Sequence, residues 1–164
     1  MAIIIKGAHY SDVNISSPNY LSLAVDFSSA TWNTAAEHEI FTVTGLVRIH
    51  LWAECTLTLT DAADAARIQL GYEGDTDYFI AITEGATGGA ELIQTGALWY
   101  DSTPTLIPEA PATAIFDSVM VPSGLDIGYE VTGAAFLTGG ITFHCVWEAL
   151  NSTGSVTAGA GGVL

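Results

Sequence analysis

Residues 41–59, with the sequence FTVTGLVRIHLWAECTLTL, alternate between apolar and mostly polar side chains with a period of two. Only an extended strand places successive side chains on opposite faces, so this stretch predicts a half-buried antiparallel sheet whose odd-numbered residues point inward. At about 3.3 Å per residue the stretch would exceed ~60 Å, which is longer than one strand of a chain of 164 residues needs. We therefore expect an interruption, and Gly45 and Cys55–Thr56 are the places that the residue types favour.

Shorter segments with strand character recur along the rest of the chain. They are residues 3–6, 21–28, 67–72, 78–83, 97–100, 114–121, 125–132 and 141–150. Segments 67–72 and 78–83 flank the turn sequence 73–77 and predict a hairpin. Eight to ten short strands without a convincing helical period predict an all-β fold, an antiparallel β-sandwich of jelly-roll type.

The domain organisation follows from length and composition. A chain of 164 residues is expected to form one domain, which we place at residues 1–150. Residues 151–164 consist almost entirely of Gly, Ala, Ser and Thr and offer little to bury. This segment is predicted to be a flexible C-terminal arm.

The charge balance excludes several classes of partner. Three Lys and Arg residues stand against 18 Asp and Glu residues, which gives a formal net charge of −15. Phosphate groups need several cations to hold them, so we expect neither nucleic acid nor an anionic membrane surface as a partner. Only 13% of the residues are charged, and because contact surfaces are depleted in charge, this predicts a homo-oligomer.

The apolar runs and the cysteines indicate the compartment in which the protein is made. The longest aliphatic run is residues 3–5, too short for a membrane span or a signal peptide, so we expect synthesis in a cytoplasm. Cys55 and Cys145 both lie on the inward phase of their strands and are predicted to be buried, reduced thiols.

No pattern of residues predicts catalysis or a cofactor site. His144 and Cys145 are neighbours on a strand and should point to opposite faces, so they cannot act together. The best oxygen-donor cluster is the hairpin turn with Glu73, Asp75 and Asp77, a weak Ca²⁺ candidate that lacks the other ligands of a calcium loop. A solvated turn is the simpler interpretation, and we predict a protein that is not an enzyme and has no metal or other cofactor.

Four residues are candidates for contacts with a partner. Trp52 and Arg48 lie on the polar phase of the long stretch, where an indole meets water unless a loop of the same chain or a partner covers it. Phe116 and Met120 lie on one face of the segment 114–121, which is apolar on both faces. That segment is either a central strand covered twice or an interface strand.

Five stretches together resemble small β-rich structural proteins of tailed bacteriophages. They are FTVTGLV at 41–47, LGYEGDTDYFIA at 70–81, LWYDSTP at 98–104, GLDIGYEV at 124–131 and FHCVW at 143–147. The likeness spans about residues 30 to 150. It implies a virion component on the capsid surface, a decoration or cement protein that binds the major capsid protein and stabilises the shell, with a trimer preferred.

Two other functions remain open at this point. One is a head-fibre or tail adaptor, which would be carried by the virion away from the shell lattice. The other is a carbohydrate-binding sandwich, in which exposed Trp32, Trp99 or Tyr100 would serve as sugar platforms.

Overall fold

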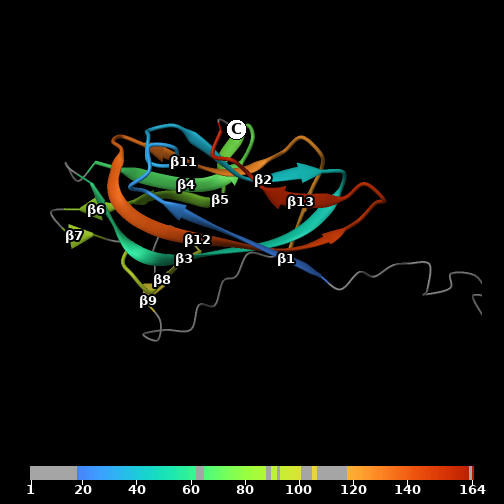
Figure 1. Cartoon of the computed structure of the whole chain (residues 1–164), viewed down its shortest axis with the longest axis horizontal. Coiled ribbons are helices and arrows are strands. Elements are labelled where there is room, and N and C mark those ends of the chain that lie inside the picture. Colours follow the sequence, from blue (N-terminus) through green and yellow to red (C-terminus); the bar gives the residue numbers. More distant parts are fainter. Residues whose placement is uncertain are drawn as a thin grey trace, which may run out of the picture.

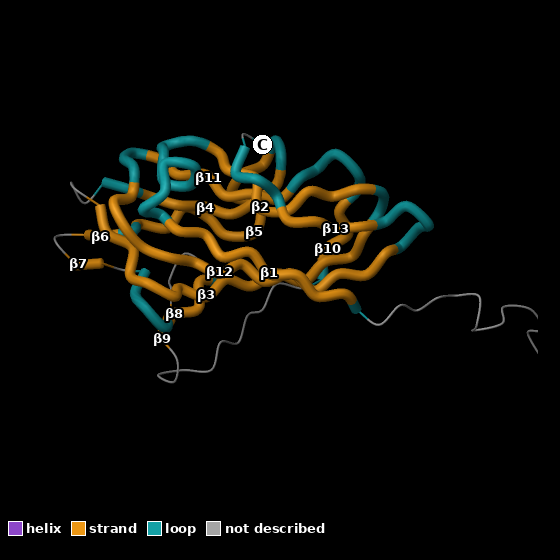
Figure 2. The backbone as a smooth tube through the Cα atoms, viewed as in Figure 1, coloured by secondary structure: helices purple, strands orange, loops and turns teal. Residues whose placement is uncertain are grey.

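The computed structural model describes residues 18–61, 65–87, 90–91, 93–100, 105–106, 118–162 and 164. These residues form thirteen strands and no helix. Two antiparallel sheets lie face to face with the hydrophobic core between them (Figures 1 and 2). The prediction of an all-β antiparallel sandwich is confirmed.

The first sheet, called sheet A, has the order β1-β12-β3-β8-β9, and a further strand, β10, pairs with the start of β3. Its strands are β1 (Asn19–Asp26), β12 (Phe136–Ala149), β3 (Val47–Asp61), β8 (Ala97–Trp99), β9 (Thr105–Leu106) and β10 (Val119–Val121).

The second sheet, called sheet B, has the order β13-β2-β11-β4-β5. Its strands are β13 (Ser155–Ala158), β2 (Glu37–Thr44), β11 (Ile127–Thr132), β4 (Arg67–Tyr72) and β5 (Asp75–Glu84). The short strands β6 (Ala86–Thr87) and β7 (Ala90–Glu91) pair with each other. The strand number exceeds the expected eight to ten because β6, β7 and β9 are two residues long and because β13 lies in the segment expected to be flexible.

Strands that are distant in the sequence pair in a nested order. β1 pairs with β12, β2 with β11, β3 with β8, and β4 with β5. The innermost pair, β4 and β5, is the predicted hairpin, although its turn is tighter than expected because β5 already begins at Asp75. The chain therefore resembles one long hairpin that has been folded over, so that each half of the hairpin contributes one pair of strands to each sheet.

The stretch 41–59 is interrupted where the residue types predicted. At Gly45 the backbone has φ +67° and the chain passes from β2 in sheet B to β3 in sheet A. A Cβ atom there would lie 2.6 Å from the backbone carbon of Thr153, so only glycine fits. The second interruption is a bulge at Thr56, because Cys55 pairs with Ile141 while Leu57 pairs with the preceding residue, Gly140.

The bulge reverses the direction of one side chain. The alternation predicts that Leu57 points inward, which is wrong, because Leu57 is 55% exposed. One extra residue in a strand reverses the phase that follows it. The pairing shifts again between Gly140 and Phe136, and Leu59 is fully buried.

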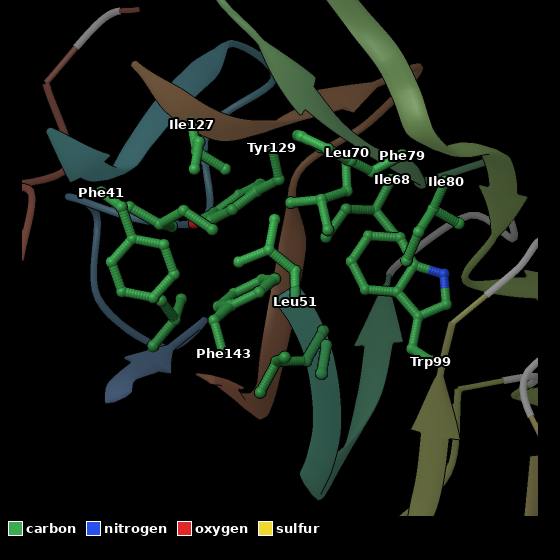
Figure 3. Packing of buried hydrophobic residues seen from close by; sticks show 14 of the residues in the cluster. Phe41, Leu51, Ile68, Leu70, Phe79, Ile80, Trp99, Ile127, Tyr129 and Phe143 are labelled. Carbon is green, nitrogen blue, oxygen red and sulfur yellow. The ribbon is translucent and has the colours of Figure 1, made fainter. Parts of the chain in front are cut away.

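Large side chains from both sheets fill the space between them (Figure 3). Tyr129 of sheet B stacks on Phe143 of sheet A with ring centroids 5.6 Å apart and an interplanar angle of 7°. Phe27, which follows β1, packs against Tyr129 at 5.6 Å and edge-on against Phe136 at 5.2 Å. The core is thus one contiguous cluster that joins both sheets.

The expectation of a flexible C-terminal arm is wrong for the described part of residues 151–164. β13 pairs with β2 along its whole length, and Val156 is only 5% exposed. Beyond β13, Gly159 N–H donates to the Ile40 carbonyl and Glu39 N–H donates to the Gly162 carbonyl, both at 2.8 Å. Backbone hydrogen bonds to the edge of an existing sheet hold this segment, and they do not depend on side-chain hydrophobicity.

Two predicted segments fall partly or wholly outside the described residues. Residues 3–6 lie outside them, and of 114–121 only β10, with its flanking Ser118, is described. In β10 Val121 is buried and Met120 points outward, which agrees with the predicted phases.

Candidate interaction surface

The outer face of sheet A brings together residues that are far apart in the sequence. Antiparallel pairing places side chains from β1, β12 and β3 side by side in rows across this face. The rows are Tyr20, Val146 and His50; Ser22, His144 and Trp52; and Ala24, Thr142 and Glu54. At one end lies the row Glu148, Arg48 and Met120, and at the other end Asp26 pairs with Gly140.

Four rings gather in the middle of this face, and we call Tyr20, His50, Trp52 and His144 the ring cluster. His144 stacks on Trp52 with ring centroids 4.9 Å apart and an interplanar angle of 9°. Tyr20 lies 6.0 Å from His144 and 6.3 Å from Trp52, and His50 lies 6.0 Å from Trp52. Trp52 is therefore half-buried by rings of neighbouring strands, while Tyr20 remains 58% exposed above them.

His144 occupies an unusual electrostatic position within the ring cluster. Its Nδ1 lies 2.7 Å from the Tyr20 hydroxyl, whereas its buried Nε2 has no hydrogen-bond partner. The Glu54 carboxylate is 3.9 Å from Nε2, beyond hydrogen-bond distance. Burial lowers the pKa of His144, and the negative charge of Glu54 only partly offsets this. A neutral imidazole with its proton on Nε2 suits both neighbours, since Tyr20 then donates to Nδ1.

Three of the four predicted contact residues meet on this face. Arg48 forms an exposed ion pair with Glu148 at 3.6 Å, and Met120, directly opposite Arg48 on β10, is 67% exposed. Trp52 belongs to the ring cluster two rows away. Phe116 lies outside the described residues. Sequence reasoning missed Tyr20 and His144 as the neighbours of Trp52, because strand register between distant segments cannot be read from one sequence.

The end of the same face beyond Glu54 is hollowed. The hollow has a volume of about 410 Å³. Its lining residues are Ala24, Val25, Asp26, Ser28, Thr56, Leu57, Thr138, Gly139 and Gly140. The bulge at Thr56 and the two consecutive glycines of β12 lie at this place.

The three carboxylates of the calcium candidate lie at the turn of the β4–β5 hairpin. Glu73 lies in the turn between β4 and β5, and Asp75 and Asp77 lie in the first turn-proximal part of β5. Loss of hydration raises the pKa of the Asp75 carboxyl. The neighbouring Asp77 raises it further, through a hydrogen bond and through its negative charge. Within the described residues, no group of three or more His, Cys, Asp or Glu side chains is placed to hold a metal ion.

The aromatic residues proposed as sugar platforms are not positioned for that role together. Trp99 is fully buried, so its assignment as an exposed platform is wrong. Its position in β8 turns the indole into the core, where it is edge-on to Phe143. Trp32 and Tyr100 are partly buried. The Trp32 carbonyl accepts a 2.7 Å hydrogen bond from the Tyr129 hydroxyl, and the Trp32 ring packs against Gly161.

Both cysteines are buried and free, and they point into the core as predicted. Burial raises the pKa of Cys55 to about 11 and that of Cys145 to about 12. Neither thiol is therefore a reactive thiolate at neutral pH. His144 and Cys145 lie on opposite faces of β12, so the His144 imidazole does not face the Cys145 thiol.

Comparisons with known proteins give little support of their own. No protein-family model matches the chain, and no curated protein matches it. The chain is similar to a chain in a solved structure described as the acidic stable capsid structure of Helicobacter pylori bacteriophage KHP30. The identity is 11%, the match covers 86% of this chain and 98% of that one, and the TM-score is 0.41. A likeness at this level carries no inference about function.

Among the described residues there is no helix with the length and hydropathy of a membrane span.

Proposed function

We propose that this protein is a non-enzymatic structural component of a tailed-phage virion, which decorates and stabilises the capsid exterior as a homo-oligomer. The nested pairing of β1 with β12, β2 with β11, β3 with β8 and β4 with β5 supports a jelly-roll classification. Jelly rolls are common among viral capsid proteins, and they also occur in lectins. This is support by analogy of fold, and it agrees with the resemblance carried by residues 41–147.

The observation that carries the proposal is an exposed apolar side chain beside a cation, at the β10 end of the outer face of sheet A. Met120 is the most exposed of the large hydrophobic side chains of the described residues and stands beside Arg48, one of three cations in the chain. Methionine and arginine are enriched in protein contacts. A partner surface that covered Met120 and accepted hydrogen bonds from Arg48 would contact both side chains. Such a contact needs no further basic residues of this chain.

The proposed partners are further copies of this chain, in a trimer, and the major capsid protein. Seating through an oligomer multiplies weak single contacts by avidity. A formal charge of −15 disfavours contact with packaged nucleic acid and is compatible with a position outside the shell.

A reconstruction of intact virions tests the location, and native mass spectrometry of the free protein tests the oligomer. We expect the protein at regular positions on the shell, a trimer in solution, and a lower resistance to heat and osmotic shock in particles that lack it. Location at the tail or portal would support the adaptor function instead. Equal robustness of particles without the protein would contradict stabilisation.

A pair of variants tests the contact surface. Met120→Asp should prevent association with the shell or between copies, because it buries a carboxylate in the contact, beside an Arg48 that is already paired with Glu148. Ile82→Asp is the matched control, since Ile82 is 48% exposed on β5 of the opposite sheet. Loss of association in the control alone would move the interface to sheet B.

A further inference from the structure

Two glycines without side chains are among the residues that line the hollow on the outer face of sheet A. They are Gly139 and Gly140, at the bulge of β12 against β3. A Cβ atom on Gly140 would lie 2.8 Å from the Thr56 hydroxyl and 3.5 Å from the Leu57 Cβ, so glycine keeps this space open. Gly139 faces the other way, where a Cβ atom would lie 2.3 Å from Leu59 Cδ2 in the core and φ is +137°. The two glycines thus serve different purposes, and only one of them is explained by packing of the core.

The walls of the hollow combine hydroxyl groups, one carboxylate and apolar carbon. Ser28, Thr56 and Thr138 supply hydroxyls, and Asp26 supplies the carboxylate. Asp26 Oδ1 accepts hydrogen bonds from the Ser28 N–H at 2.8 Å and the Ser28 hydroxyl at 2.7 Å. These bonds lower the pKa of Asp26 and fix the carboxylate in its ionised form. The exposed side chain of Leu57 forms an apolar wall.

This combination of groups selects a class of ligand. Ligand sites typically combine apolar walls with a few placed polar groups. A sugar ring presents C–H groups on its faces, which suit Leu57, and hydroxyls around its rim, which can donate to a carboxylate and exchange hydrogen bonds with Ser and Thr. The lining contains no Lys or Arg, and Asp26 is negative, so anionic sugars and phosphates are disfavoured.

The neighbouring rows would extend such a site along the strands. Ala24, Thr142 and Glu54 form the row that adjoins the hollow, and the ring cluster begins with the next row, at Trp52 and His144. Successive rows are about 7 Å apart, because two residues of a strand separate them. The strip from the hollow to the ring cluster therefore offers hydroxyls and carboxylates followed by aromatic rings.

We infer that the hollow between Asp26, Gly140 and Leu57, with the row of Ala24 and Glu54 beside it, binds a neutral oligosaccharide. The site belongs to one copy of the chain and does not rest on the proposed virion function. It differs from a site built on Trp32, Trp99 and Tyr100, since none of these residues lines the hollow.

The test uses the full chain and a panel of neutral di- to tetrasaccharides built from glucose, galactose and N-acetylglucosamine. Binding is screened by saturation-transfer NMR, and the best ligand is then titrated by calorimetry. Ala24→Gln should fill the hollow from an exposed position without touching the core and should weaken binding at least about tenfold. Leu57→Ser and Asp26→Asn should each weaken it several-fold.

Matched variants on the opposite sheet give the controls. Ala81 and Ile82 are exposed on β5, so Ala81→Gln and Ile82→Ser make the same chemical changes away from the hollow. They should leave the affinity within about twofold of the unmodified chain. Circular dichroism and the melting temperature of each variant exclude unfolding as the cause of a loss.

Three results would overturn the inference. One is the absence of binding to every sugar of the panel at millimolar concentrations. The second is binding that Ala24→Gln leaves unchanged, which would place the sugar elsewhere. The third is preferential binding of an oligolysine peptide over every sugar, with loss in Asp26→Asn, which would make the hollow a site for basic peptides.

Discussion

Trp99 Nε1 donates a 3.0 Å hydrogen bond to Thr83 Oγ1, and this contact between two buried side chains links the two sheets of the sandwich. Trp99 lies in β8 of sheet A and Thr83 in β5 of sheet B. The Thr83 hydroxyl in turn donates to the Ala81 carbonyl at 3.1 Å. The indole can thus be buried completely at the side of the core where β5 is the edge strand, because its only polar group is satisfied.

Thr83→Val should therefore destabilise the protein, although the two side chains have nearly the same shape. The change leaves the buried Trp99 N–H without an acceptor, at a cost of about 1–3 kcal/mol. Urea unfolding of Thr83→Val, Trp99→Phe and the double variant measures the coupling between the two residues. We expect Thr83→Val to cost clearly less in the Trp99→Phe background, and strictly additive costs would show that the bond does not contribute.

The two thiols should react slowly in the native protein. Cys55 and Cys145 are fully buried, and their raised pKa values keep them protonated at neutral pH. Labelling with a thiol reagent, followed by mass spectrometry, should proceed at a rate set by unfolding and become fast in denaturant. Rapid reaction of either thiol without denaturant would contradict the inward phase of its strand.

Strand β13 should contribute measurably to stability. Val156→Ala removes two methyl groups from a side chain that is 5% exposed and should cost about 1–2 kcal/mol. Thr157→Ala, at the next residue and on the exposed face, should change the free energy of unfolding by less than about 0.5 kcal/mol. A chain truncated after Gly154 should melt at a clearly lower temperature. An unchanged melting temperature would mean that the segment 155–164 is dispensable for folding.

The sequence predicted the features that depend on local pattern. Alternation predicted residues 41–44 of β2, most of β3 and the β4–β5 hairpin, and the residue types at Gly45 and Cys55–Thr56 marked the crossing between sheets and the bulge. The inward phase of Cys55 and Cys145 followed from the same alternation.

The remaining features depend on contacts between distant segments. β13 has a weak sequence signal because the edge of β2, and not its own side chains, holds most of it. The ring cluster forms only because the register of β1 on β12 and of β12 on β3 brings Tyr20 and His144 to Trp52. The hollow arises from a bulge in β3 opposite glycines in β12, which a single sequence does not pair.

The ring cluster also predicts a specific dependence of stability on pH. In the folded protein burial lowers the pKa of His144, so the unfolded chain takes up a proton at a higher pH than the folded chain does. The contribution of His144 to the free energy of unfolding should therefore be largest above about pH 6.5, the ordinary pKa of histidine, and should fall as the pH decreases below it. Glu54 at 3.9 Å and the Tyr20 hydroxyl at 2.7 Å are the polar groups nearest to the ring, and the attraction of Glu54 for the imidazolium limits the size of the fall.

His144→Gln should remove this contribution while it keeps an acceptor for the Tyr20 hydroxyl. Urea unfolding of both proteins between about pH 5 and 8 measures the difference between their free energies of unfolding. This difference should narrow as the pH falls, because only the unmodified chain carries a buried imidazole that takes up a proton more readily when it is unfolded. His50→Gln on the same face is the control, and it should retain the pH dependence that His144 causes. If the difference between the unmodified protein and His144→Gln is constant with pH, or widens toward acid, the imidazole is not held in its neutral form by the ring cluster.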